Sequence, residues 1–167
     1  MAPYDDPEEL DRMYAVFRET PIHALLGIDY VDRPSEGIEA NADDEVVVKM
    51  PVRAEAYGSG GNLHGGAIAT LIDVASASAA ARASGFVPGE TSLVTADLHV
   101  RYLGRPKGDM VYAKARTVRA GRMLIVVECR VVDDEDRVIA VADFSSMIVP
   151  LREPLPGAPR HPASPEQ

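Results

Sequence analysis

Apolar residues dominate positions 65–83, and their pattern predicts a helix. The segment reads GGAIATLIDVASASAAARA, and its only charged residues are Asp73 and Arg82. A helix on the surface of a domain keeps a polar face toward water, whereas a helix that is apolar nearly all round lies inside the fold. We therefore expect other elements to enclose this helix on most sides.

The rest of the chain shows the patterns of one short helix and several strands. An amphipathic helix is predicted at residues 7–18, because Pro7 suits a first helical turn and the acidic residues that follow suit its dipole. The runs between glycine-, proline- and aspartate-rich breaks predict strands at residues 26–33, 36–52, 91–103, 109–119, 122–133 and 136–149, with a turn or bulge near 41–44. This order predicts an α+β fold, in which an antiparallel sheet of about six strands wraps around the long central helix.

The length of 167 residues allows one domain with a substantial core, which we assign to residues 1–150. Residues 151–167 are rich in proline and poor in large apolar side chains, so we expect a flexible tail. The acidic N-terminal segment is unlike a secretory signal, and no apolar run is long enough to span a membrane. These features predict a soluble, cytoplasmic protein.

Acidic residues outnumber basic ones, and the formal net charge of −9 argues against nucleic acid as a partner. The charge is unevenly distributed, because residues 1–45 hold 13 acids and 3 bases whereas residues 101–130 hold 8 bases and 2 acids. The basic segment could hold a small anionic ligand, or its charges could simply keep exposed strand edges apart. The one cysteine, Cys129, excludes an intrachain disulfide and a cysteine-rich metal site.

Asp73 is the first candidate functional residue, because it lies in the middle of the apolar helix. A buried carboxylate without a partner is costly, and its pKa is expected to rise. The helix face around Asp73 carries only small residues, namely Gly66, Ala69, Thr70, Ser76, Ala77 and Ala80. Either a substrate approaches the carboxylate over this face, or a second backbone packs there and hydrogen bonds satisfy Asp73.

The segment that leads into the helix, Asn62-Leu63-His64-Gly65-Gly66, is the second candidate. Two glycines at a helix start leave backbone N–H groups open to a ligand, and these groups suit a developing oxyanion. His64 could bind a carbonyl, or it could be a structural cap on the loop. Gly65 and Asp73 lie eight residues apart, which is roughly 12 Å along a helix axis. Because the two cannot grip one carbonyl within a chain, we predict a homodimer with shared sites.

These residues resemble those of the hotdog-fold acyl-CoA thioesterases, in particular the PaaI-like and Them2-like branch. The resemblance rests on His64-Gly65-Gly66 followed by Asp73, with Leu71 and Ala75 near it. It extends to the strand TADLHVRYL at residues 95–103 and to the hairpin Ala120-Gly121-Arg122, and it covers roughly residues 20–150. The resemblance implies a hotdog fold and thioester hydrolysis.

The resemblance also implies roles for single residues. Asp73 would be the general base or the nucleophile, the Gly65 N–H would polarise the carbonyl from the facing subunit, and Thr95 would position water. His64 would support the carbonyl site, and Asn62 and Gly66 would contact substrate. The family often has asparagine six residues before the histidine, where this chain has Gly58. Either Asn62 takes over that role or the amide is absent.

Coenzyme A would enter as part of the substrate, and we expect no metal or separate cofactor. Its phosphates are expected to bind basic residues near strand ends, namely Arg101, Arg105, Lys107, Arg119 and Arg122. The protein would act as a homodimer or as a dimer of dimers. The alternative is a protein of the same fold that binds acyl-CoA or an acyl carrier without catalysis. A hotdog hydratase is disfavoured, because its different His/Asp arrangement is not found in the sequence.

Overall fold

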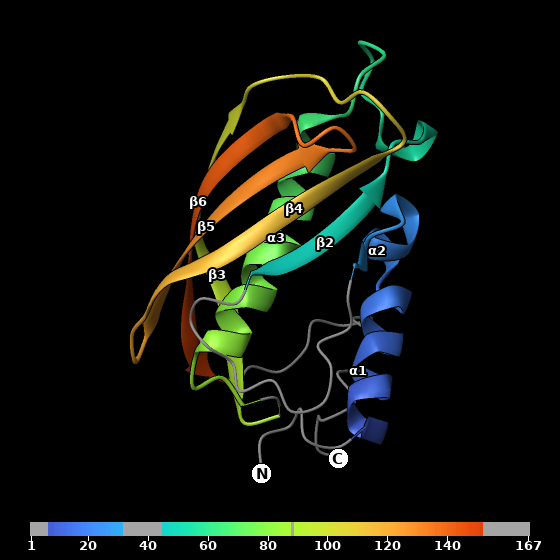
Figure 1. The fold of residues 1–167 in the computed structure, drawn as a ribbon. Helices are drawn as coiled ribbons and strands as arrows, with labels where there is room; N and C mark the ends of the chain where they lie inside the picture. Colours follow the sequence, from blue (N-terminus) through green and yellow to red (C-terminus); the bar gives the residue numbers. More distant parts are fainter. Residues whose placement is uncertain (1–6, 32–44, 88, 152–167) are drawn as a thin grey trace.

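The computed structural model describes residues 7–31, 45–87 and 89–151. One antiparallel sheet of six strands curls around a central helix, and two further helices lie beside that helix (Figure 1). The strand order across the sheet is β1-β2-β4-β5-β6-β3. The predicted α+β architecture, with its sheet wrapped around one long helix, is therefore confirmed.

The elements follow one another along the chain in the expected sequence. Their bounds are α1 (Pro7–Glu19), α2 (Pro21–Leu26), β1 (Asp29–Tyr30), β2 (Val46–Pro51), a 3₁₀ turn (Ala54–Ala56), α3 (Gly65–Ala83), β3 (Thr91–Tyr102), β4 (Met110–Ala120), β5 (Leu124–Asp133) and β6 (Val138–Pro150). The predicted central helix agrees with α3 at both ends. The last four strands end within about two residues of their predicted limits, which is the usual uncertainty of such boundaries.

The prediction was wrong between the first helix and the second strand. Residues 21–26 form the short helix α2, and of the predicted strand 26–33 the structure shows β1 at Asp29–Tyr30, whereas residues 32–33 lie outside the described residues. Pro21 occupies the first turn of α2, and Gly27 ends it in the left-handed conformation with φ of 68°. Of the second predicted strand, residues 46–51 are confirmed, whereas residues 36–44, including the expected turn, lie outside the described residues. The predicted tail is described only at Leu151.

The core lies between α3 and the inner face of the sheet. One cross-strand row of this face runs through Val48, Ala113, Val131 and Ala140, all of which are fully buried, and ends at Tyr102 on the edge strand β3. Small side chains on α3 and on the strands let the sheet close around the helix, and burying apolar side chains stabilises the arrangement. No helix in the described ranges is long and apolar enough to cross a membrane.

Candidate active site

The glycine loop before α3 is closed by its own backbone and by His64. The Gly58 N–H donates to the Asn62 carbonyl at 2.8 Å, and the His64 N–H donates to the Ala56 carbonyl at 2.8 Å. His64 is the N-cap residue of α3, and its Nδ1 accepts a hydrogen bond from the Gly66 N–H at 2.8 Å. Of the two readings of His64 made from the sequence, the structural cap is the contact that this structure contains.

Gly58 lies directly against the His64 ring. A Cβ atom at this position would lie 3.3 Å from the His64 Cδ2 atom, which is a tight contact. An asparagine here would therefore require the ring to move. Asn62 is half-buried in the same loop, and the hydrogen bond from the Gly58 N–H goes to its main-chain carbonyl and not to its side-chain amide.

Gly65 presents a free donor at the start of α3. Its carbonyl accepts a hydrogen bond from the Tyr102 hydroxyl at 2.9 Å, whereas its N–H has no partner among the residues that the structure describes. The first N–H groups of a helix have no intrahelical acceptor and lie at the positive end of the dipole. Tyr102, which sequence reasoning did not single out, thus anchors this end of α3 to the end of β3.

Asp73 on α3 accepts a hydrogen bond from Thr95 on the neighbouring strand β3. The Thr95 hydroxyl donates to the Asp73 Oδ1 atom at 2.8 Å, across the contact between β3 and α3. The carboxylate is half-buried instead of enclosed, because this face of α3 meets the edge strand and not the centre of the sheet. A charged acceptor strengthens such a hydrogen bond, typically to about 1.5–3 kcal/mol.

A β-bulge in β3 directs both Thr95 and Tyr102 toward α3. Residues seven apart in a regular strand face opposite sides of a sheet. In β3, Thr95 pairs with Ser146 and Asp97 pairs with Ser145, so that one extra residue, Ala96, lies between them. Because of this extra residue, the Tyr102 side chain lies on the same side of the sheet as the Thr95 side chain. β3 therefore contacts α3 at both Asp73 and Gly65.

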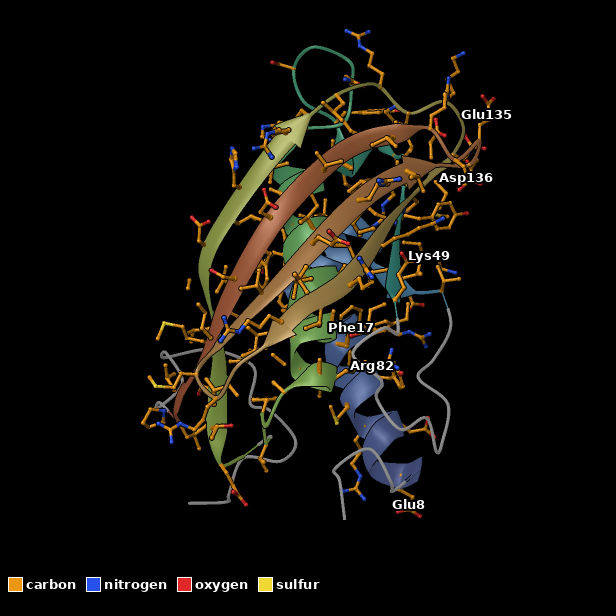
Figure 2. The ribbon with its side chains drawn as sticks, turned by 60° about the vertical axis from the view of Figure 1, so that its left-hand side comes forward. Glu8, Phe17, Lys49, Arg82, Glu135 and Asp136 are labelled. Carbon is orange, nitrogen blue, oxygen red and sulfur yellow. The ribbon has the colours of Figure 1, made fainter. Side chains whose placement is uncertain are left out.

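A mainly apolar pocket of about 410 Å³ opens beside Asp73. It lies between α1 and α3, and its lining includes Phe17 of α1 and Arg82 of α3, both labelled in Figure 2. Tyr14, Phe17 and Tyr30 form an aromatic wall, with ring centroids 5.4 Å apart for Tyr14 and Tyr30 and 4.5 Å apart for Phe17 and Tyr30. The opposite wall is α3, where Asp73 is one of the lining residues. An apolar group bound here would place its polar end at the carboxylate.

His23 is the second polar group of this pocket that can carry out acid–base chemistry, and the sequence analysis missed it. Its Nδ1 lies 2.8 Å from the Phe17 carbonyl oxygen, and its ring packs on the Phe17 ring at 4.5 Å. Burial lowers the pKa of His23 from its ordinary value of 6.5, although the Phe17 carbonyl and the Asp73 charge oppose this shift. No spacing in the sequence signals His23, because α2 reaches α3 only in the folded chain.

The five predicted basic residues do not form one cluster. Arg101, Arg105 and Lys107 lie at or after the end of β3, whereas Arg119 and Arg122 lie at the β4–β5 hairpin. The length of β4 separates the two groups, which is roughly 30 Å at the usual rise per residue. Arg101 also pairs with Asp143 at 3.3 Å.

The segment from the glycine loop to the start of β6, residues 60–140, matches the thioesterase superfamily. The chain therefore resembles this superfamily over just under half of its length. A predicted esterase from Halobacterium salinarum is 35% identical over 102 residues, which cover 59% of this chain and 66% of that protein, just under two thirds of its length.

Solved structures of thioesterase-superfamily proteins share the fold. A thioesterase from Haemophilus influenzae superposes with a TM-score of 0.70 at 21% identity, covering 86% of this chain and 92% of its own. The E. coli PaaI protein, from the phenylacetic acid degradation operon, gives a TM-score of 0.66 at 21% identity, covering 83% and 91%. At this level of identity the likeness establishes the hotdog fold. The chemistry has to be argued from the residues of the site.

Other nucleophiles and metal sites are less well supported than Asp73. Burial raises the pKa of Cys129 to about 12, so this cysteine stays a thiol at neutral pH and lies inside the core. In the described part of the chain, no group of three His, Cys, Asp or Glu side chains is arranged to hold a metal ion. Asp73 with its Thr95 partner is therefore the candidate centre.

Proposed function

We propose that this protein hydrolyses acyl-CoA thioesters to a free acid and coenzyme A. The observation that supports the proposal best is the Asp73 carboxylate, which Thr95 holds at the wall of an apolar pocket. The pocket suits an acyl group, and the carboxylate lies where the polar thioester would be. The match of residues 60–140 to the thioesterase superfamily supports the same reaction class.

In the proposed reaction, the thioester carbonyl accepts a hydrogen bond from the Gly65 N–H at the start of α3. This donor stabilises negative charge on the carbonyl oxygen as the tetrahedral intermediate forms. Asp73 either removes a proton from water, which attacks the carbonyl carbon, or attacks that carbon itself. Thioesters are activated acyl donors, so one carboxylate and one oxyanion donor are sufficient machinery.

The proposal includes a homodimer, because Gly65 and Asp73 lie eight residues apart on one straight helix. That spacing corresponds to roughly 12 Å, which is too far for both to act on one carbonyl. The edge strand β3 supports this arrangement, since its outer edge has no partner strand in the described sheet. A two-fold axis between Leu98 and His99 of β3 would bring Thr95 of one subunit beside Tyr102 of the partner subunit. Asp73 would then face Gly65 of the partner subunit.

The experiment that tests this function is a thiol-release assay with a panel of acyl-CoA substrates. We expect the wild type to release coenzyme A and the Asp73→Asn variant to lose at least about 10²-fold in kcat, because the base or nucleophile is missing. The substitution preserves the size of the side chain, so its unfolding temperature is a check on folding. Full activity of Asp73→Asn would contradict the mechanism, and binding of acyl-CoA without any cleavage would instead support a ligand-binding protein.

A further inference from the structure

The hydrogen bonds of Asp73 and His23 determine which of their atoms at the pocket can donate or accept a further hydrogen bond. The Asp73 Oδ1 atom accepts from Thr95, and Oδ2 has no hydrogen-bond partner among the described residues. The Nδ1 atom of His23 lies at hydrogen-bonding distance from the Phe17 carbonyl oxygen, which can only accept. The His23 Nδ1 atom must therefore carry the hydrogen.

The remaining nitrogen of His23 is then an acceptor. The half-buried position of the ring lowers the pKa of His23, so the neutral form prevails at pH 7. A neutral imidazole with its hydrogen on Nδ1 has a lone pair on Nε2. His23 thus brings a second acceptor to the pocket that Asp73 lines, from a different element of the fold.

Two acceptors that line one pocket can both be satisfied by a single molecule that donates two hydrogens. The other titratable or charged groups that line this pocket are Tyr14 and Tyr30 on the aromatic wall and Arg82 on α3. Water has two donor hydrogens and an oxygen lone pair, and it is the co-substrate of the proposed hydrolysis. An acyl chain offers no such donors.

We propose that His23 positions the attacking water by accepting one of its hydrogens on Nε2, while Asp73 Oδ2 accepts the other. This inference rests on the proposed thioester hydrolysis, with Asp73 as the general base. It explains why a polar ring projects into a mainly apolar pocket beside the carboxylate.

The proposed step balances in atoms and charge. The proton that faces Asp73 moves to its carboxylate while the water oxygen forms a bond to the thioester carbon, and the carbonyl oxygen becomes an oxyanion. Collapse of this intermediate breaks the C–S bond, and the thiolate leaves with the proton from Asp73. The second hydrogen of the water stays on oxygen throughout and becomes the hydrogen of the product acid, which then ionises to solvent.

Two variants separate this role from a packing role of His23. His23→Phe keeps a flat ring against Phe17 but has no acceptor, whereas His23→Gln keeps an acceptor oxygen. We expect His23→Phe to lose about tenfold in kcat with an unchanged KM, because one hydrogen bond to the water is absent. We expect His23→Gln to recover most of that loss. Wild-type kcat in His23→Phe, or an equal loss in both variants, would overturn the proposal.

A double-mutant cycle with Asp73→Asn covers the case in which a His23 variant is destabilised. If His23 acts through the water that Asp73 holds, His23→Phe should reduce kcat much less in the Asp73→Asn background than in the wild type. A purely structural role predicts the same fold-loss in both backgrounds, which would contradict the inference. Failure of the proposed function itself is distinguishable, because the wild type would then release no thiol from any acyl-CoA.

Discussion

At the scale of single residues, the site depends on contacts that neutralise or position one carboxylate. Asp73 lies in an apolar helix and is stabilised by the hydroxyl of Thr95. The sequence identified Asp73 as a candidate, because it is the one charged residue in the middle of an apolar helix. The resemblance named Thr95 only as a residue that positions water, and the structure shows that its hydroxyl is the hydrogen-bond partner of Asp73.

The Thr95 hydrogen bond leads to a prediction for activity. Thr95→Val keeps the shape and the β-branch of the side chain but removes the donor to Asp73. We expect kcat for acyl-CoA hydrolysis to fall by about 10- to 100-fold, the equivalent of a hydrogen bond to a charged group. Thr95→Ser, which keeps the hydroxyl, is the matched control and should remain within a few-fold of wild type. A fully active Thr95→Val variant would show that the Asp73 orientation does not depend on this bond.

At the scale of elements, the sheet separates charges that are neighbours in the sequence. Arg105 and Lys107 lie in the connection from β3 to β4, at the opposite end of β4 from Arg119 and Arg122. The connection is fixed by Asp133, which accepts from the Lys107 N–H at 2.9 Å. Asp133 is buried, and its contact with Arg137 keeps its pKa well below the usual range. Within one chain, one group of these cations, not all five, can therefore reach the phosphates of a single coenzyme A.

The separation predicts unequal effects of two double variants. Arg105→Gln with Lys107→Gln neutralises one end of the sheet, and Arg119→Gln with Arg122→Gln neutralises the other, so each is the control for the other. We expect one pair to raise KM for an acyl-CoA several-fold, because it removes charge-assisted contacts with phosphate. A short thioester without the nucleotide should show no such change. Equal effects on both substrates would argue against phosphate binding.

At the scale of the whole molecule, one chain holds the two halves of the proposed site too far apart. Gly65 and Asp73 are fixed at the two ends of the same contact between β3 and α3, by Tyr102 and Thr95 respectively. No movement of a rigid helix brings them together. The second copy is therefore a chemical requirement of the mechanism, and it can be tested without a structure of the dimer.

Subunit complementation tests the shared site. Gly65→Pro removes the proposed oxyanion donor but suits the first position of α3, because the preceding His64 already has φ of −65° and ψ of 134°. Gly65→Ala, which keeps the N–H, is its control. We expect Gly65→Pro and Asp73→Asn each to be inactive as homodimers, and the purified heterodimer to regain about half of wild-type activity, since one of its two sites is intact. A heterodimer without activity would contradict the shared site.

The sequence by itself determined the elements that local patterns specify. The apolar segment predicted both ends of α3. The alternation of apolar and polar residues, with clear breaks between the runs, predicted the four long strands. Both signals depend only on neighbouring residues. The helix α2 was missed, since it is a six-residue helix and helices this short depend on tertiary packing for most of their stability.

Only the tertiary structure decided which groups meet. The bulge at Ala96 turns both Thr95 and Tyr102 toward α3, and the packing of α2 brings His23 to the pocket of Asp73. These contacts join residues far apart in the chain, and their geometry depends on sheet register and helix packing, which no short-range pattern encodes. The sequence thus identified the carboxylate, and the fold determined what surrounds it.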